Sequence, residues 1–98
     1  MNQIKNKEEF NEVIKKDKVV IDFYADWCGP CKMLSPILEE VAKEEQVDIW
    51  KVNVDEQEEL AREYGIMSIP TIIVFKQGEK TNKNVGYMDK EELLELMK

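Results

Sequence analysis

The 98-residue sequence contains no histidine and only two cysteines, four glycines and three prolines. Long apolar runs are also missing, since the longest ones have the length of a strand and fall far short of the roughly 20 residues of a membrane-spanning helix. The first ten residues, MNQIKNKEEF, carry charges where a secretion signal needs an apolar core. We therefore expect an intracellular, cytoplasmic protein without a transmembrane helix.

Basic residues are outnumbered, because 14 Lys and Arg stand against 21 Asp and Glu and give a net charge of -7. Such a surface repels nucleic-acid phosphates and anionic membranes, so we expect neither as a partner. Apolar residues make up 43% of the chain, which is typical of a folded globular protein. The length suits one small domain spanning residues 1–98.

Helical and strand patterns alternate along the chain without a linker or repeat. Strands are predicted at 19–24 (VVIDFY), 47–54 and 71–75, and a weaker one follows the turn at 76–79 and ends near Gly86, with a weak edge strand at 2–5. Helices are predicted at about 7–16, at 30–45 with a bend at Pro36, at about 55–64, and from Asp89 onward. Their N-terminal capping boxes are Asn6 with Glu9, Asp55 with Glu58, and Asp89 with Glu92. This order predicts an α/β fold with a central mixed, mostly parallel sheet, a C-terminal antiparallel hairpin and about four flanking helices.

Both cysteines lie in WCGPC, where the strand predicted at 19–24 passes into the helix predicted at 30–45. Cys28 is expected at the first turn of that helix, where unpaired N–H groups and the helix dipole favour a thiolate. Cys31 is close enough to close a disulfide with it and should be less exposed. A zinc site lacks further thiol or imidazole ligands, and a structural disulfide would close too small a loop to stabilise much. A redox-active pair is the favoured interpretation.

Asp22 and Lys51 are charged residues inside otherwise apolar strands. A carboxyl group buried at Asp22 has a raised pKa, as a proton carrier needs. The alternative for Asp22 is a charge at a strand end that is bonded to solvent. Lys51 pairs with Asp22 if their strands are neighbours, and otherwise it is a lysine exposed at a sheet edge.

Pro70 has a routine structural interpretation, and Trp27 allows two interpretations. Pro70 opens a central strand, where a routine strand-entry proline is tolerated if its missing donor is not needed. Trp27 is either part of the core or a substrate contact, and its position next to the cysteines favours contact.

Several ordered motifs carry a resemblance to one family. VVIDFYAD precedes WCGPC, and PILEEVA, VNVD, YGIMSIPTIIVFKQGE and VGY follow it in that order. With these motifs the chain resembles thioredoxins along essentially its full length. The resemblance implies the thioredoxin fold and a protein-disulfide reductase that works through a reversible Cys28–Cys31 disulfide, without a bound cofactor or metal. It implies disulfide-containing substrate proteins and thioredoxin reductase as partners, and we expect the chain to be a monomer.

The resemblance also implies roles for individual residues. Cys28 is the attacking thiolate, Cys31 resolves the mixed disulfide, and Asp22 helps to deprotonate Cys31. The Ile69–Pro70 bond is expected to be cis and to pack against the cysteines, with the Ile69 backbone pairing with an extended substrate segment. The substrate-docking patch is expected to comprise Trp27, Gly29, Pro30, Ile69, Pro70, Gly86 and Tyr87.

The chain departs from the commonest thioredoxin pattern at a few positions. Tyr24 stands where many members have Trp, and we expect this to change fluorescence more than chemistry. Met67 and Ser68 replace a charged residue or glycine before the Ile–Pro pair, which leaves the substrate range open. Two other functions remain to be weighed: a disulfide oxidant or isomerase, and a binding subunit in which docking matters more than the sulfurs.

Overall fold

The computed structural model describes residues 1–98 and contains five strands and four helices. The strands are β1 (Asn2–Gln3), β2 (Val19–Tyr24), β3 (Asp48–Asn53), β4 (Thr71–Lys76) and β5 (Glu79–Val85). The helices are α1 (Lys7–Val13), α2 (Gly29–Glu45), α3 (Glu58–Glu63) and α4 (Lys90–Leu96). All predicted elements are present, although α1 and α3 are shorter than their sequence patterns indicate.

The strands form one sheet in the order β1-β3-β2-β4-β5. Strand β3 runs parallel to both β1 and β2, whereas β4 runs antiparallel to β2 and to β5. The predicted mixed sheet with a C-terminal hairpin is therefore confirmed. Its antiparallel part is larger than the hairpin alone, because β4 also lies antiparallel against β2.

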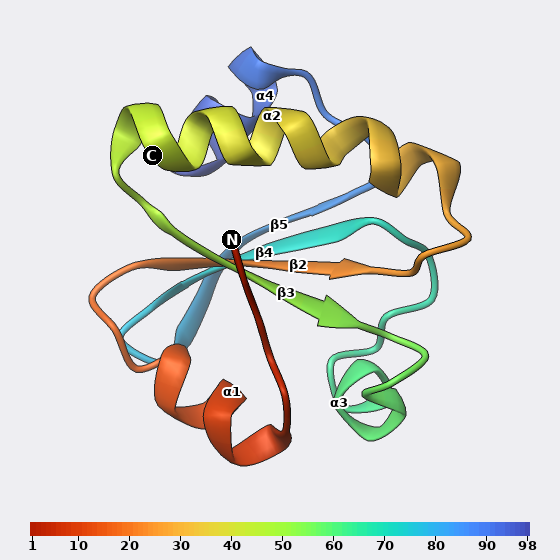
Figure 1. Cartoon of the computed structure of the whole chain (residues 1–98). Coiled ribbons are helices and arrows are strands. Elements are labelled where there is room, and N and C mark those ends of the chain that lie inside the picture. Colours follow the sequence, from red (N-terminus) through yellow and green to blue (C-terminus); the bar gives the residue numbers. More distant parts are fainter.

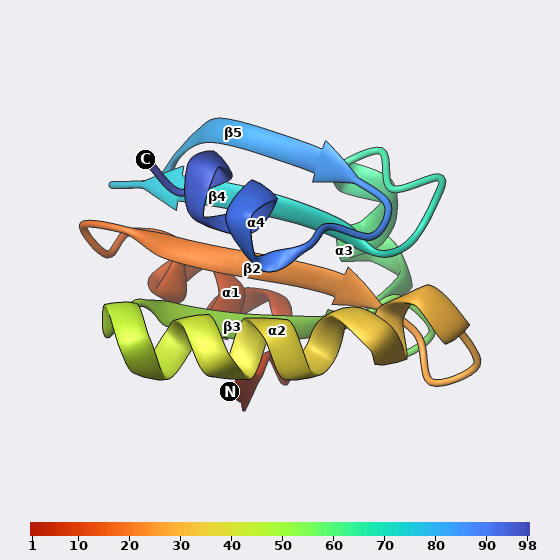
Figure 2. The ribbon, with the colours of Figure 1, turned by 90° about the horizontal axis from the view of Figure 1, so that it is seen from above.

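Helices cover both faces of the sheet (Figure 1). Helices α1 and α3 lie on one face and α2 and α4 on the other, and seen from above α2 lies over β3 (Figure 2). One buried cluster, which includes Phe10, Phe23 and Phe75, lies on the α1 face, and a second, which includes Leu34, Leu38 and Leu93, lies on the α2 face. No helix has the length and apolar content needed to span a lipid bilayer.

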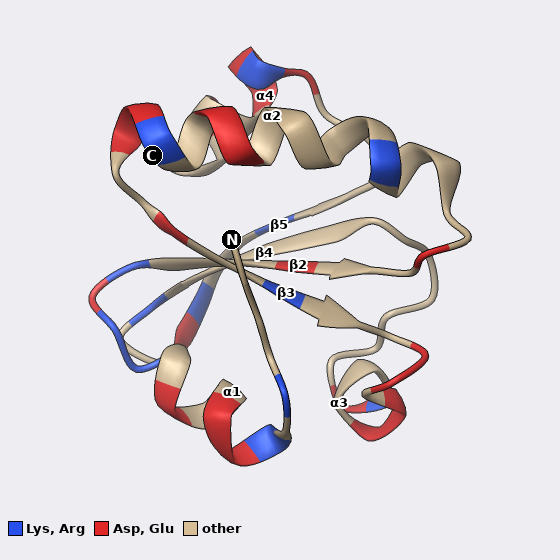
Figure 3. Ribbon diagram, viewed as in Figure 1, with Lys and Arg blue, Asp and Glu red and all other residues tan.

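Strand β2 has all six residues buried, as expected for a central strand covered on both faces. Its neighbour β3 is less buried because only the two-residue β1 covers its other edge. Figure 3 shows an acidic interruption in β2 beside a basic one in β3. These are Asp22 and Lys51, which face each other in the parallel register.

Of the three predicted capping boxes, one is complete and one is half formed, because the Glu9 carboxylate accepts the N–H of Lys5 and not that of Asn6. The Asn6 side chain accepts the N–H of Glu9, and Asp89 and Glu92 form a complete capping box. The prediction that Asp55 caps the third helix is wrong. Helix α3 begins at Glu58, and its N-cap residue Gln57 makes no side-chain capping bond.

The physical reason lies in Asn53, the last residue of β3. Its side-chain oxygen accepts the N–H of Asp55 at 2.9 Å and of Glu56 at 3.3 Å. Since these bonds fold residues 53–56 into a turn, the helix starts only after it.

The topology brings distant segments to one end of the sheet. Strand β2 ends where the antiparallel β4 begins, since Phe23 pairs with Thr71, and β5 ends at the same place, since Thr71 also pairs with Val85. The segments that follow β2, precede β4 and follow β5 therefore meet at this end. They contain WCGPC, Ile69–Pro70 and Gly86–Tyr87.

Candidate active site

Cys28 and Cys31 are joined by a disulfide, with their Cα atoms 5.2 Å apart. Cys28 is the N-cap residue of α2, and its sulfur accepts the N–H of Cys31 at 3.2 Å. The first turn of this 17-residue helix contains no acidic residue that would oppose a negative charge on the sulfur. Helix position and hydrogen bond both favour a thiolate at Cys28 once the disulfide is reduced.

The two cysteines are almost equally buried, with Cys28 4% and Cys31 5% exposed. The prediction that Cys31 is the less exposed one is therefore wrong for the oxidised protein. Cys28 is covered because it belongs to a buried cluster with Tyr24 and Ala25, against which Ile69 packs. Both cysteines are therefore largely covered in the oxidised protein.

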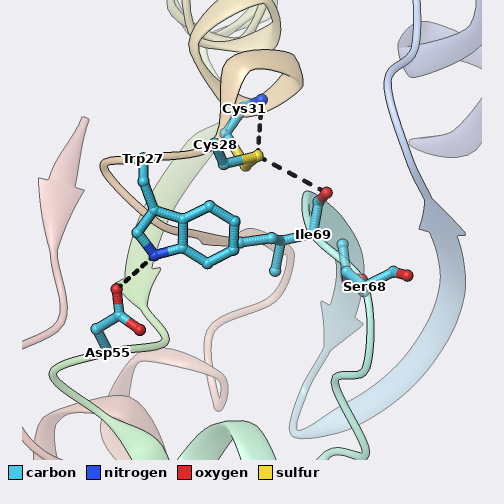
Figure 4. The surroundings of a disulfide bond; sticks show 7 residues. Trp27, Cys28, Cys31, Asp55, Ser68 and Ile69 are labelled. Carbon is cyan, nitrogen blue, oxygen red and sulfur yellow. Dashed lines mark hydrogen bonds between the residues drawn. A yellow bond between two sulfur atoms is a disulfide. The ribbon is translucent and has the colours of Figure 1, made fainter.

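The Ile69–Pro70 peptide bond is cis, as the resemblance implied. The Ile69 carbonyl oxygen lies 3.7 Å from the Cys28 sulfur (Figure 4). While the disulfide is closed this sulfur carries no proton, so the approach is a contact, and a Cys28 thiol can donate a hydrogen bond there. The Thr71 hydroxyl donates to the Ser68 carbonyl at 2.6 Å and ties the preceding loop to β4.

Trp27 lies at the surface, with 70% of its area exposed, so the alternative of a core tryptophan is excluded. Its indole N–H donates to the Asp55 carboxylate at 2.9 Å (Figure 4). Asp55 follows β3 and is 28 positions away in the sequence. No local pattern marks it as a contact of Trp27, and the sequence interpretation assigned its side chain to a helix cap instead.

The other residues of the expected docking patch lie around the disulfide end of the sheet. Gly29 and Pro30 are exposed at the start of α2, and Tyr87 is 45% exposed. Gly86 has a φ of 101°, a conformation that favours glycine, and its N–H donates to the Pro70 carbonyl at 2.8 Å. Met67, which no sequence argument placed in the patch, is 96% exposed next to this group.

Asp22 is 2% exposed, and burial raises the pKa of its carboxyl group to about 7. The charge of Lys51 opposes this and lowers the pKa by a smaller amount. The Oδ1 atom of Asp22 has no hydrogen-bond partner. Because Asp22 is buried and lies inside β2, it is not a solvent-exposed charge at a strand end.

Lys51 faces Asp22 across the β2–β3 register, yet the two side chains do not form an ion pair. The Lys51 ammonium instead lies 4.1 Å from the centre of the Tyr24 ring. Tyr24 and Lys51, together with Cys31, line an open pocket of about 500 Å³. The remaining lining residues are Ala25, Asp26, Lys32, Ser35, Pro36 and Glu39.

This arrangement defines a class of protein. A disulfide at the N-terminus of a helix, a backbone carbonyl beside its sulfur and a buried acid in the strand that leads to it are the parts of a thiol–disulfide oxidoreductase. The thioredoxin family model matches residues 2–98. The chain belongs to the thioredoxin family.

Individual relatives agree with this assignment. The chain is 48% identical to the thioredoxin of Mycoplasmoides gallisepticum over 100 aligned positions, which cover 100% of both chains. Among solved structures, a mutant thioredoxin from Halobacterium salinarum superposes with a TM-score of 0.92 at 38% identity, covering 98% of this chain and 86% of the other. Thioredoxin from Plasmodium falciparum gives a TM-score of 0.92 at 33% identity, covering 99% and 96%. The protein is a protein-disulfide reductase with a redox-active Cys28–Cys31 disulfide, and its partners are disulfide-containing substrates and thioredoxin reductase.

Proposed function

We propose that the protein reduces disulfides of partner proteins through a mixed disulfide on Cys28. In the first step the Cys28 thiolate attacks one sulfur of the substrate disulfide, and the other substrate sulfur leaves as a thiolate that takes up a proton. In the second step the Cys31 thiol loses its proton, attacks the Cys28 sulfur and releases the second substrate thiolate. Two electrons pass to the substrate, and the Cys28–Cys31 disulfide remains.

The observation that carries this assignment is the position of the Cys28 sulfur. It caps α2, accepts the Cys31 N–H and lies beside the Ile69 carbonyl, whereas Cys31 is one turn further along the helix. An extended substrate segment can pair with the Ile69 backbone there, next to the attacking sulfur. Trp27, Gly29, Pro30, Pro70, Gly86 and Tyr87 complete the proposed docking patch.

Asp22 serves in this proposal as the acceptor of the Cys31 proton. Its pKa of about 7 lets it take up and return a proton near neutral pH. Lys51 moderates that pKa through its charge. We further propose that residues 1–98 act as a single domain, as a monomer and in the cytoplasm, where thioredoxin reductase returns Cys28 and Cys31 to the dithiol form.

Replacing Cys31 with serine tests the division of labour between the two cysteines. The Cys31→Ser variant is expected to accumulate a stable mixed disulfide with a disulfide-containing protein, which mass spectrometry detects as a covalent adduct on Cys28. The matched control, Cys28→Ser, is expected to form no such adduct at an appreciable rate. Adducts on Cys31 in the control, or none in either variant, would contradict the assignment.

A further inference from the structure

Asp22 and Lys51 do not form the ion pair that their positions in the sheet would allow. Asp22 and Lys51 are direct register partners on neighbouring strands, and their opposite charges attract. The Oδ1 atom of Asp22 nevertheless has no partner, and the Lys51 ammonium lies over the Tyr24 ring. The ring therefore competes with the carboxyl group for the same cation.

Strand geometry explains how the ring reaches the lysine. Asp22 and Tyr24 point to the same face of β2 because they are two positions apart. A lysine side chain is much longer than an aspartate side chain, so the Lys51 ammonium extends diagonally to the next β2 residue on the same face, which is Tyr24. Ammonium groups bind aromatic faces at such distances, and the interaction strengthens when the site is shielded from water.

A hydrogen bond from Gln3 in β1 holds the Tyr24 ring in place. Gln3 of β1 is the register partner of Lys51 on the edge away from Asp22. Its amide donates to the Tyr24 hydroxyl at 2.5 Å, so the contact reaches across β3 from β1 to β2. Tyr24 is 8% exposed and packs in the cluster that contains Cys28 and Cys31. The ring is thus held by its hydroxyl and by its packing in this cluster.

We propose that Tyr24 is a positioning residue for proton transfer: its ring holds the Lys51 ammonium away from the Asp22 carboxyl group, which therefore stays unpaired and able to exchange a proton. This inference rests on the proposed role of Asp22 as proton carrier. The neighbourhood offers no other cation at the carboxyl group, since its partner on β4 is the apolar Ile72. Other charged groups around Tyr24 and Lys51 are Asp26, Lys32 and Glu39 of the pocket wall and Glu56, whose charge acts on Tyr24.

The main experiment compares Tyr24→Leu with Tyr24→Phe. Without the ring, Lys51 can fold back onto Asp22 and stabilise the carboxylate, so the titration midpoint of Asp22, followed by ¹³C NMR of its carboxyl carbon, is expected to fall by about one pH unit. The pH profile for Cys31 attack on a mixed disulfide should move in the same direction. Tyr24→Phe keeps the ring and is expected to shift the midpoint by less than half as much.

A double-mutant comparison separates the effect of Lys51 on the Asp22 pKa from the effect of added water. Removing the ring also opens the pocket to water, which could lower the Asp22 pKa without any help from Lys51. In a Lys51→Met background the shift caused by Tyr24→Leu is expected to vanish. An unchanged or higher midpoint in Tyr24→Leu, an equal shift in Tyr24→Phe, or a shift that persists in the Lys51→Met background overturns the proposal.

Gln3→Leu is the second variant, because Gln3 is exposed on the edge strand and its replacement spares the core. Gln3→Leu is expected to lower the Asp22 titration midpoint by less than Tyr24→Leu does. If Tyr24→Leu does not fold, the Gln3→Leu variant alone tests the proposal. An unchanged or higher midpoint in Gln3→Leu overturns the proposal. The role of Asp22 is tested separately with Asp22→Asn. If this variant resolves mixed disulfides as fast as the unmodified protein, the proton-carrier role itself fails. If it is slow while Tyr24 variants leave the Asp22 titration unchanged, only the positioning role fails.

Discussion

The buried carboxyl group of Asp22 makes the stability of the fold depend on pH. In the unfolded chain its pKa is near the ordinary value of 3.8, whereas in the folded protein it is about 7. The folded state therefore binds this proton more tightly. The stability that Asp22 contributes is fully present below about pH 4 and is lost as the pH rises through about 7.

Asp22→Asn is expected to stabilise the oxidised protein above neutral pH. Asparagine resembles the neutral acid in shape and has no charge to bury, so the variant avoids the cost of the ionised carboxylate. At pH 8.5 its free energy of unfolding should exceed that of the unmodified protein by about 4 kcal/mol, since each pKa unit corresponds to about 1.4 kcal/mol. Near pH 5 this excess should fall to about 1.7 kcal/mol, because the carboxyl group of the unfolded chain is already ionised there, and it disappears only below about pH 4. Denaturant titration at both pH values measures this, and equal stabilities at pH 8.5 would contradict the raised pKa.

Residue by residue, the sequence predicts best what depends on one strand or one motif. The burial of Asp22 follows from the apolar residues around it in β2, and the cis Ile69–Pro70 bond follows from the family motif. The contact of Tyr24 with Lys51 could not be predicted in this way, because it depends on the diagonal offset between two strands. The equal burial of the two cysteines depends on the distant Ile69 segment for a similar reason.

At the scale of elements, the cap of α3 shows how a distant contact overrides a local signal. Asn6 and Asp89 cap their helices because donor and acceptor are three residues apart and nothing else competes for them. Asp55 has the same local pattern. Its N–H is taken by Asn53 and its carboxylate by Trp27, so the helix begins later than the pattern indicates.

The Trp27–Asp55 bond joins the loop before α2 to the loop before α3, and we expect it to hold the exposed indole ready for substrate. Asp55→Ala removes the acceptor and frees the side chain. A hydrogen bond of this kind contributes on the order of 1 kcal/mol, so the KM for a protein disulfide substrate should rise about fivefold with kcat nearly unchanged. Asp55→Asn keeps an acceptor oxygen and is the matched control. A KM that is unchanged in Asp55→Ala would show that the bond does not organise the docking patch.

At the scale of the whole molecule, the net charge of -7 acts on every approaching disulfide. Figure 3 shows acidic segments in the loops after β2 and after β3. These loops contain Asp26, two residues before Cys28, and Asp55, which binds the Trp27 indole. Lys32 is a basic residue that lines the same pocket as Asp26. The field at the site is therefore expected to repel anions and to attract cations.

The reduced protein should consequently react with small disulfides in an order set by their charge. At low salt the dication cystamine is expected to react about tenfold faster than the anionic oxidised glutathione. To remove the intrinsic reactivity of each disulfide, its rate is first divided by its rate with a small thiol of similar pKa. The neutral 2-hydroxyethyl disulfide should fall between them. Because salt screens charges beyond about 10 Å at 0.1 M, the ratio should shrink as salt is added. Asp26→Asn should reduce the ratio of the cystamine rate to the oxidised glutathione rate at low salt. Stopped-flow rates that do not depend on the charge of the disulfide would contradict the prediction that the acidic surface affects access to the sulfur.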